Sequence, residues 1–107
     1  MELPKVVERF IETQHSHDSK AFADCFAETA IVHDEGRTHN GKEEIQRWIE
    51  HSMSAYKSQL EPLNYEQSES KGILTANVSG TFPGSPIALK FNFGLKDGLI
   101  DSLKVTE

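Results

Sequence analysis

Titratable side chains gather where one short apolar run of this 107-residue chain ends. His33, Asp34 and Glu35 follow that run directly, and His39 and His51 come soon afterwards. A carboxylate can remove a proton, and an imidazole can donate a hydrogen bond or relay a proton. These residue types fit three interpretations: a general acid–base site, a metal site, or a solvated strand end.

Strand alternation indicates which of these side chains can act together. In a strand from Ala30 to Asp34, Val32 and Asp34 share one face, whereas His33 and Glu35 take the opposite face. If Val32 points into a barrel, Asp34 does so as well. Partial desolvation at an apolar mouth raises the pKa of a carboxyl group towards that of a useful base. Asp34 is therefore our candidate for the catalytic base.

The alternative for Asp34 is a structural role, either capping the turn at Gly36 or pairing with Arg37 in solvent. His39 lies just before a predicted helix, and His51 lies within that helix. Either histidine would supply a hydrogen-bond donor beside a catalytic Asp34. The alternative for each is an ordinary surface histidine.

Metal and cofactor chemistry is disfavoured by the spacing. His33, Asp34, Glu35 and His39 contain suitable ligand atoms, but no His-x-x-x-His or Glu-x-x-His pair lies on one helix, and adjacent strand residues point apart. No Gly-x-Ser-x-Gly sequence, phosphate-binding loop or dinucleotide fingerprint is present. We expect no metal and no cofactor, so any enzyme would be a lyase or isomerase acting by proton abstraction.

The first half of the chain has helical periodicity, and the second half alternates with period two. The first predicted helix is 4–14, the second is capped by Asp18 or Ser19, and the third is capped by Asn40 with Glu43. The buried face of the second helix is predicted to carry Phe22, Cys25 and Phe26. The predicted strands are 30–34, 59–69, 74–82, 87–96 and 99–105. Pro62 indicates an edge position or a bulge, and the out-of-phase Ile100 indicates a bulge in the last strand. The order α-α-β-α-β-β-β-β predicts one α+β domain over residues 1–107, with a curved antiparallel sheet closing over three helices.

Composition limits the partners. The net charge of −6 and the absence of a Lys/Arg cluster disfavour nucleic acid and anionic membranes. No apolar stretch approaches the roughly 20 residues that span a bilayer, and no signal peptide is visible. The single Cys25 cannot form an internal disulfide. We interpret Cys25 as a structural apolar residue and expect a cytoplasmic protein.

Several segments resemble the nuclear-transport-factor-2-like superfamily, and within it the SnoaL-like and ketosteroid-isomerase-like branches. The similar stretches are Val6-Val7-Glu8-Arg9-Phe10, His17-Asp18, Phe22-Ala23-Asp24-Cys25-Phe26-Ala27, Ala30-Ile31-Val32-His33-Asp34 and Asn40-Gly41-Lys42-Glu43-Glu44-Ile45. The resemblance implies a cone-shaped fold with an apolar pocket open at one end, commonly assembled as a homodimer. The outer sheet face, which carries small polar residues, would form that interface.

The resemblance also assigns roles within the pocket. Asp34 falls where steroid isomerases carry their general-base aspartate. Phe10 and Phe91 fall where those enzymes carry oxyanion donors, a tyrosine and a protonated aspartate. Because losing one such donor typically costs about a hundred-fold to a thousand-fold in rate, we expect no steroid isomerase activity.

Apolar side chains are the candidates for ligand contacts. They are Phe10, Phe26, Val32, Trp48, Phe82, Phe91 and Phe93. Each of them could instead simply fill the core. The function that these observations favour is binding of a small apolar or carbonyl-containing molecule, with isomerase, cyclase or dehydratase chemistry at Asp34. The alternative is a non-catalytic ligand-binding or homodimerisation module.

Overall fold

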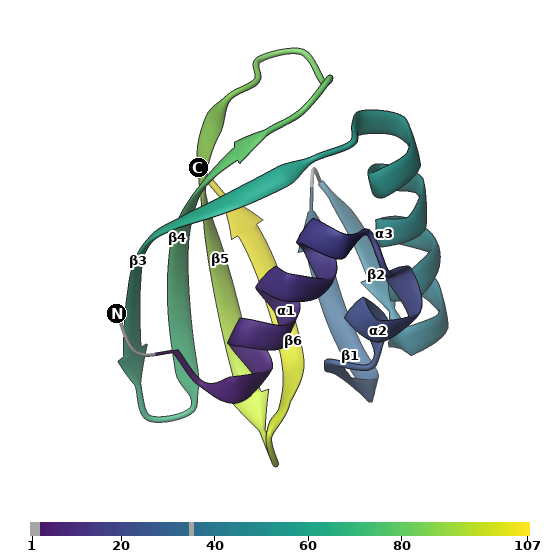
Figure 1. Ribbon diagram of the computed structural model, residues 1–107. Helices are drawn as coiled ribbons and strands as arrows, with labels where there is room; N and C mark the ends of the chain where they lie inside the picture. Colours follow the sequence, from purple (N-terminus) through teal and green to yellow (C-terminus); the bar gives the residue numbers. More distant parts are fainter. Residues whose placement is uncertain (1–2, 35) are drawn as a thin grey trace.

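Helices cover the concave face of a curved sheet (Figure 1). The computed structural model describes residues 3–34 and 36–107, with the backbone alone at Tyr56. In this part of the chain the elements are α1 (Lys5–Ser16), α2 (Ser19–Ala23), β1 (Phe26–Asp34), β2 (Arg37–Asn40), α3 (Gly41–Tyr56), β3 (Gln59–Ser68), β4 (Lys71–Ser79), β5 (Ile87–Lys96) and β6 (Leu99–Thr106). None of the described helices is both long and apolar enough to cross a membrane.

The sheet is open and mainly antiparallel. Its strand order is β2-β1-β6-β5-β4-β3, and β1 runs parallel to β6 while all other neighbours are antiparallel. The predicted α+β plan is confirmed, with two differences. The parallel pair was not predicted, because a strand's own pattern does not indicate the direction of a partner far away in sequence. The short β2 was missed, because its four residues Arg-Thr-His-Asn carry no apolar alternation.

Element boundaries differ most around α2. This helix ends at Ala23, so Cys25 and Phe26 do not lie on its buried face as predicted. Phe26 instead opens β1, four residues before the predicted start. The strand predicted at 74–82 runs from Lys71 to Ser79. The limits of a strand depend on its hydrogen bonding to a neighbouring strand, which the apolar alternation of one segment does not show.

Two bulges confirm what the sequence indicated. Gly94 pairs with Ser102, but the next residue of β5 pairs with Ile100, so Asp101 is the extra residue in β6. This insertion returns Ile100 to the buried face. In the edge strand β3 the pairing shifts between Pro62 and Asn64. Pro62 is tolerated there because proline has no backbone N–H that would need an acceptor.

The helix caps confirm one prediction and correct another. Asp18 caps α2, because its Oδ1 accepts a hydrogen bond from the backbone N–H of Ala21 at 3.1 Å. At α3 the side chain of Asn40 makes no cap bond. The backbone N–H of Asn40 instead donates to Glu44 Oε1 at 2.9 Å. Glu44 therefore takes the place predicted for Glu43, whose carboxylate pairs with Arg47 one turn further on.

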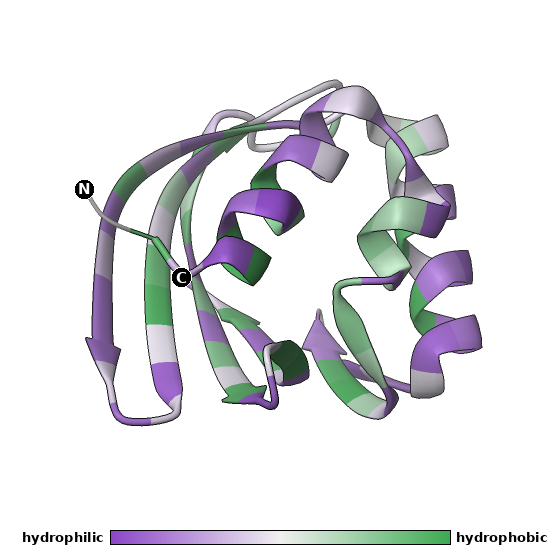
Figure 2. Ribbon diagram, turned by 60° about the horizontal axis from the view of Figure 1, so that its bottom comes forward, coloured by the Kyte–Doolittle hydropathy of each residue, from purple (hydrophilic) through white to green (hydrophobic). Residues whose placement is uncertain are grey.

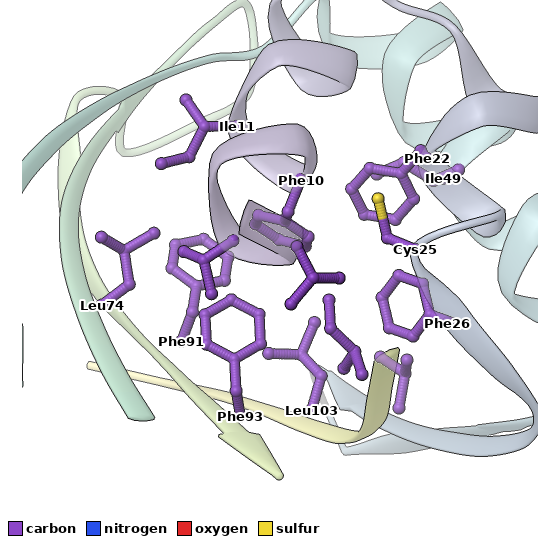
Figure 3. Close-up of a cluster of buried hydrophobic side chains, with 14 of the residues drawn as sticks. Phe10, Ile11, Phe22, Cys25, Phe26, Ile49, Leu74, Phe91, Phe93 and Leu103 are labelled. Carbon is purple, nitrogen blue, oxygen red and sulfur yellow. The ribbon is translucent and has the colours of Figure 1, made fainter. Parts of the chain in front are cut away.

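Apolar positions of the helices and strands face one another across the interior, and polar positions alternate with them (Figure 2). At the centre Phe10 projects from α1 between Phe91 and Phe93 on β5 and the segment carrying Phe22 and Phe26 (Figure 3). Its ring lies 4.9 Å from that of Phe22, 5.1 Å from Phe93 and 5.7 Å from Phe91, centroid to centroid. Phe10 is fully buried, so α1 is held to the sheet through this ring.

We expect Phe10→Ala to lower the free energy of unfolding by about 3–5 kcal/mol, because it removes a ring contacted on several sides. Leu63→Ala is the matched control, since Leu63 is 52% exposed. The control should cost less than about 1 kcal/mol. Urea unfolding followed by circular dichroism measures both. Similar losses for the two variants would contradict the central position of Phe10.

Candidate functional site

Asp34 ends β1, half-buried, on the face that the sequence predicts. Val32 is fully buried, whereas Ile31 is 38% exposed and His33 is exposed. The alternation of faces along this strand is therefore confirmed. Trp48 on α3 reaches this point, and its Nε1–H donates to Asp34 Oδ2 at 3.3 Å. The end of β1 and the helix α3 are thus joined by a hydrogen bond between the Trp48 indole and the Asp34 carboxylate.

An inner cavity of about 560 Å³ lies on one side of this pair. Its apolar wall includes Phe10, Trp48, Phe82, Leu89 and Phe91. The polar residues of the wall are Asp34, Gln14, Ser52, Ser58, Thr106 and Glu107. A cavity of this size lies within the range of about 300–1,000 Å³ in which proteins hold small molecules. A largely apolar space with few polar groups suits a ligand with a hydrocarbon body.

A polar outer hollow of about 650 Å³ lies on the other side. It shares Asp34, Trp48 and Ser52 with the inner cavity, and its remaining wall consists of Arg37, His39, Glu44, Arg47 and His51. The two spaces therefore differ in chemistry and meet at the same three side chains.

The structure places both predicted helper histidines in the outer hollow. His39 pairs with Val32 across β1 and β2, so it shares the face of Asp34. Its ring stacks on Trp48 with a centroid distance of 5.5 Å and an interplanar angle of 27°. His51 lies one turn after Trp48 and is exposed. Neither histidine is among the residues lining the inner cavity.

The predicted apolar contacts divide into two groups. Phe10, Trp48, Phe82 and Phe91 line the inner cavity. Phe26, Val32 and Phe93 lie in the core instead, between 0% and 2% exposed, and are not part of the cavity wall. Phe82 reaches the cavity from the loop after β4, not from the strand predicted to contain it.

Other titratable residues near Asp34 in sequence lie apart from it. His33 faces outward, where its Nδ1 and Thr38 Oγ1 are hydrogen-bonded at 3.2 Å. Glu35 lies outside the described residues. Within residues 3–34 and 36–107, no three His, Cys, Asp or Glu side chains are grouped so that they could hold a metal ion.

Cys25 is buried beside the aromatic cluster, as Figure 3 shows. Its Sγ donates a weak hydrogen bond to the Ala21 carbonyl at 3.6 Å. Burial raises the pKa of this thiol, since the charged thiolate would lose its hydration. The thiol therefore packs as a small apolar group and is a poor nucleophile at neutral pH.

Sequence reasoning missed five polar residues of the inner cavity: Gln14, Ser52, Ser58, Thr106 and Glu107. Two of them had a readable signal. Gln14 is four residues after Phe10 and Ser52 is four residues after Trp48, so each continues an apolar helix face. Ser58 follows α3 and is buried by the tertiary fold, for which the local sequence contains no indication.

This fold and cavity define a known class of protein. The sequence profile of the SnoaL-like domain matches residues 7–101. The chain therefore belongs to the SnoaL-like family of the nuclear-transport-factor-2-like superfamily, which confirms the resemblance stated above. A search of curated proteins found no match.

Solved structures agree with this assignment. A "putative polyketide cyclase" from Sinorhizobium meliloti, known from a crystal structure, is 36% identical in sequence and has a TM-score of 0.94. The comparison covers 97% of this chain and 95% of that one. A hypothetical protein of ketosteroid isomerase-like fold from Catenulispora acidiphila, in complex with trimethylamine, is 17% identical with a TM-score of 0.89, over 99% and 87% of the two chains. An uncharacterized cystatin-fold protein from Novosphingobium aromaticivorans is 13% identical with a TM-score of 0.83, over 100% and 99%. The latter two show the fold alone.

The buried thiol predicts a specific pH dependence of stability. The folded state holds the Cys25 proton more tightly than the unfolded state does. In the unfolded state the thiol has a pKa near its ordinary value of 9.0. The resulting stabilisation is complete below that pH and is lost as the pH rises through the folded-state pKa. We expect the free energy of unfolding to fall more steeply above pH 9 in the wild type than in Cys25→Ala. Urea titrations at several pH values measure both slopes, and parallel slopes would contradict the prediction.

Proposed function

We propose that this protein binds a small, largely apolar, carbonyl-containing molecule in the inner cavity and that Asp34 acts on it as a general base. One observation carries the proposal. Among the described residues, Asp34 is the one carboxylate that lines both the apolar cavity and the polar hollow. A ligand whose hydrocarbon body fills the cavity would bring a polar end to Asp34.

The proposed chemistry is cofactor-free proton transfer. The carboxylate of Asp34 takes a proton from the carbon next to the ligand's carbonyl, and the electron pair of the broken C–H bond forms an enolate. Return of that proton to another carbon is an isomerisation. Attack of the enolate carbon on a second carbonyl, whose oxygen takes the proton back from Asp34, is a cyclisation. Expulsion of a β-hydroxyl group, which takes that proton and leaves as water, is a dehydration. The Trp48 N–H orients the carboxylate for this step.

An enolate needs hydrogen-bond donors for its oxygen. Phe10 and Phe91, which hold the positions of the steroid isomerase donors, line the cavity and offer none. Donors are present in the outer hollow, where His39 and His51 lie. We therefore propose a ligand whose carbonyl oxygen points to the outer hollow, and a reaction other than steroid isomerisation. The Sinorhizobium meliloti protein described as a "putative polyketide cyclase" supports the cyclase class.

A non-catalytic binding protein is the second candidate. It is favoured by the two phenylalanines at the donor positions, because a cavity that lacks donors at those two positions binds a ligand but stabilises an enolate poorly. The two candidates share the ligand and the cavity. They differ in whether Asp34 exchanges protons with the ligand.

Hydrogen–deuterium exchange tests the base directly. The ketone 2-tetralone is an apolar probe with acidic protons beside its carbonyl. In D2O we expect the wild type to accelerate deuterium incorporation, and Asp34→Asn to slow it by about 10²–10⁴-fold, the typical contribution of a general base. Asp101→Asn is the matched control, because it removes the same charge at an exposed position of β6. Proton NMR measures the exchange.

Binding is followed separately through Trp48, the single tryptophan, whose emission should change when the probe fills the cavity. Binding without accelerated exchange would favour the non-catalytic candidate. Exchange that persists in Asp34→Asn would exclude Asp34 as the base.

We also propose a homodimer formed through the outer face of β4 and β5. Small or polar side chains occupy that face, including Thr75, Asn77, Ala88 and Asn92. Small side chains on such a face allow two sheets to approach closely. The family resemblance supports the same assembly.

Sedimentation equilibrium tests the dimer. We expect the wild type to sediment as a dimer, and Ala88→Glu to shift it towards monomer by placing two like charges in the interface. Ala55→Glu is the control, since Ala55 is exposed on α3. A wild type that sediments only as monomer at concentrations of about 10⁻⁵ M, the weak end of affinity for standard interfaces, would exclude the dimer.

A further inference from the structure

One buried polar group of the inner cavity has no partner within the described part of the chain. Gln14 in the last turn of α1 is 6% exposed and lines the inner cavity. Its Oε1 is buried and accepts no hydrogen bond from any described residue. Most buried side-chain polar atoms are hydrogen-bonded, because leaving one unpaired is costly. An unpaired acceptor in a cavity wall therefore indicates a donor that the ligand brings.

The residues next to Gln14 in this turn of α1 do make side-chain hydrogen bonds. Thr13, also buried, donates its hydroxyl to the Phe10 carbonyl at 3.1 Å. His15 donates through Nε2 to the Leu60 carbonyl, and His17 donates through Nε2 to the Ser58 carbonyl at 3.2 Å. Both histidine bonds fasten the end of α1 to the start of β3. Gln14 therefore stands on a rigid support, which is what a specific ligand contact requires.

The position of Gln14 on the helix fits a role towards the ligand. It lies one turn after Phe10, so the two side chains share a helix face, and both line the inner cavity. Asp34, Trp48 and Ser52 adjoin the outer hollow, but Gln14 does not. A ligand in the inner cavity would therefore meet Gln14 with a part that lies outside the outer hollow.

We propose that Gln14 recognises a hydroxyl group on the ligand, accepting a hydrogen bond from it at Oε1. This inference rests on the proposed function, since it assumes a ligand in the inner cavity. It narrows the ligand class to an apolar, ring-sized molecule that carries a phenolic or enolic hydroxyl in addition to the group presented to Asp34. A site built to pair with a hydroxyl discriminates against the analogue that lacks one, because its own polar atom would then stay unpaired.

Two probes of nearly equal size test the inference. 2-Naphthol offers a hydroxyl donor, and 2-methoxynaphthalene has the same ring without that donor. By isothermal titration calorimetry we expect the wild type to bind 2-naphthol about five- to ten-fold more tightly than 2-methoxynaphthalene. In Gln14→Leu this preference should disappear through weaker binding of 2-naphthol, while 2-methoxynaphthalene binds as well as before. The side-chain amide signals of Gln14 should shift in ¹⁵N NMR spectra of the wild type when 2-naphthol is added.

Two further variants complete the design. Gln46→Leu is the matched control on α3, since Gln46 is half-buried and lines neither space, and it should keep the preference for 2-naphthol. Gln14→Met is a second apolar variant of similar length, used if the leucine variant does not fold. Equal binding of both probes to the wild type, or an unchanged preference in Gln14→Leu, would overturn the inference and leave the cavity proposal standing. If neither probe binds, the inference about Gln14 and the proposal of a ligand in the inner cavity are both overturned.

Discussion

The packing of Phe10 into the concave face of the sheet is the interaction on which the rest of this molecule depends. On one side its ring meets Phe22, Phe26 and Phe93, all of them fully or almost fully buried. On the other side the same residue forms part of the wall of the inner cavity, with Phe91. α1 thus divides the interior of the cone into a filled end and a hollow end.

The hollow end is organised by Trp48. Its indole N–H donates to Asp34, its ring stacks on His39, and it lines both the inner cavity and the outer hollow. An aromatic side chain with one polar atom suits such a boundary, because the ring covers apolar surface while the N–H still finds a partner. The consequence is a carboxylate placed between an apolar and a polar environment. This placement is the geometric basis of the proposed base.

Membership of the SnoaL-like family accounts for the architecture but leaves the chemistry to the residues that line the cavity. The family resemblance places Phe10 and Phe91 at the donor positions of the steroid isomerases, and both of these apolar rings line the inner cavity, whereas His39 and His51 line the outer hollow. Gln14 provides an acceptor within the cavity at a place that these comparisons do not indicate. A ligand for this protein is therefore expected to differ from a steroid in where its polar groups lie.

The sequence by itself determined the α+β class, the two bulges and the face on which Asp34 stands. These depend on local backbone geometry and on the period of apolar residues, which a short segment already contains. Only the tertiary structure decided that β1 runs parallel to β6 and that the polar strand β2 forms. It also decided that Phe26, Val32 and Phe93 belong to the core and not to the cavity. The burial of Gln14 Oε1 without a partner among the described residues is a third feature of this kind. Each of these depends on which distant segments meet, because a side chain is core, cavity wall or surface only relative to what is packed against it.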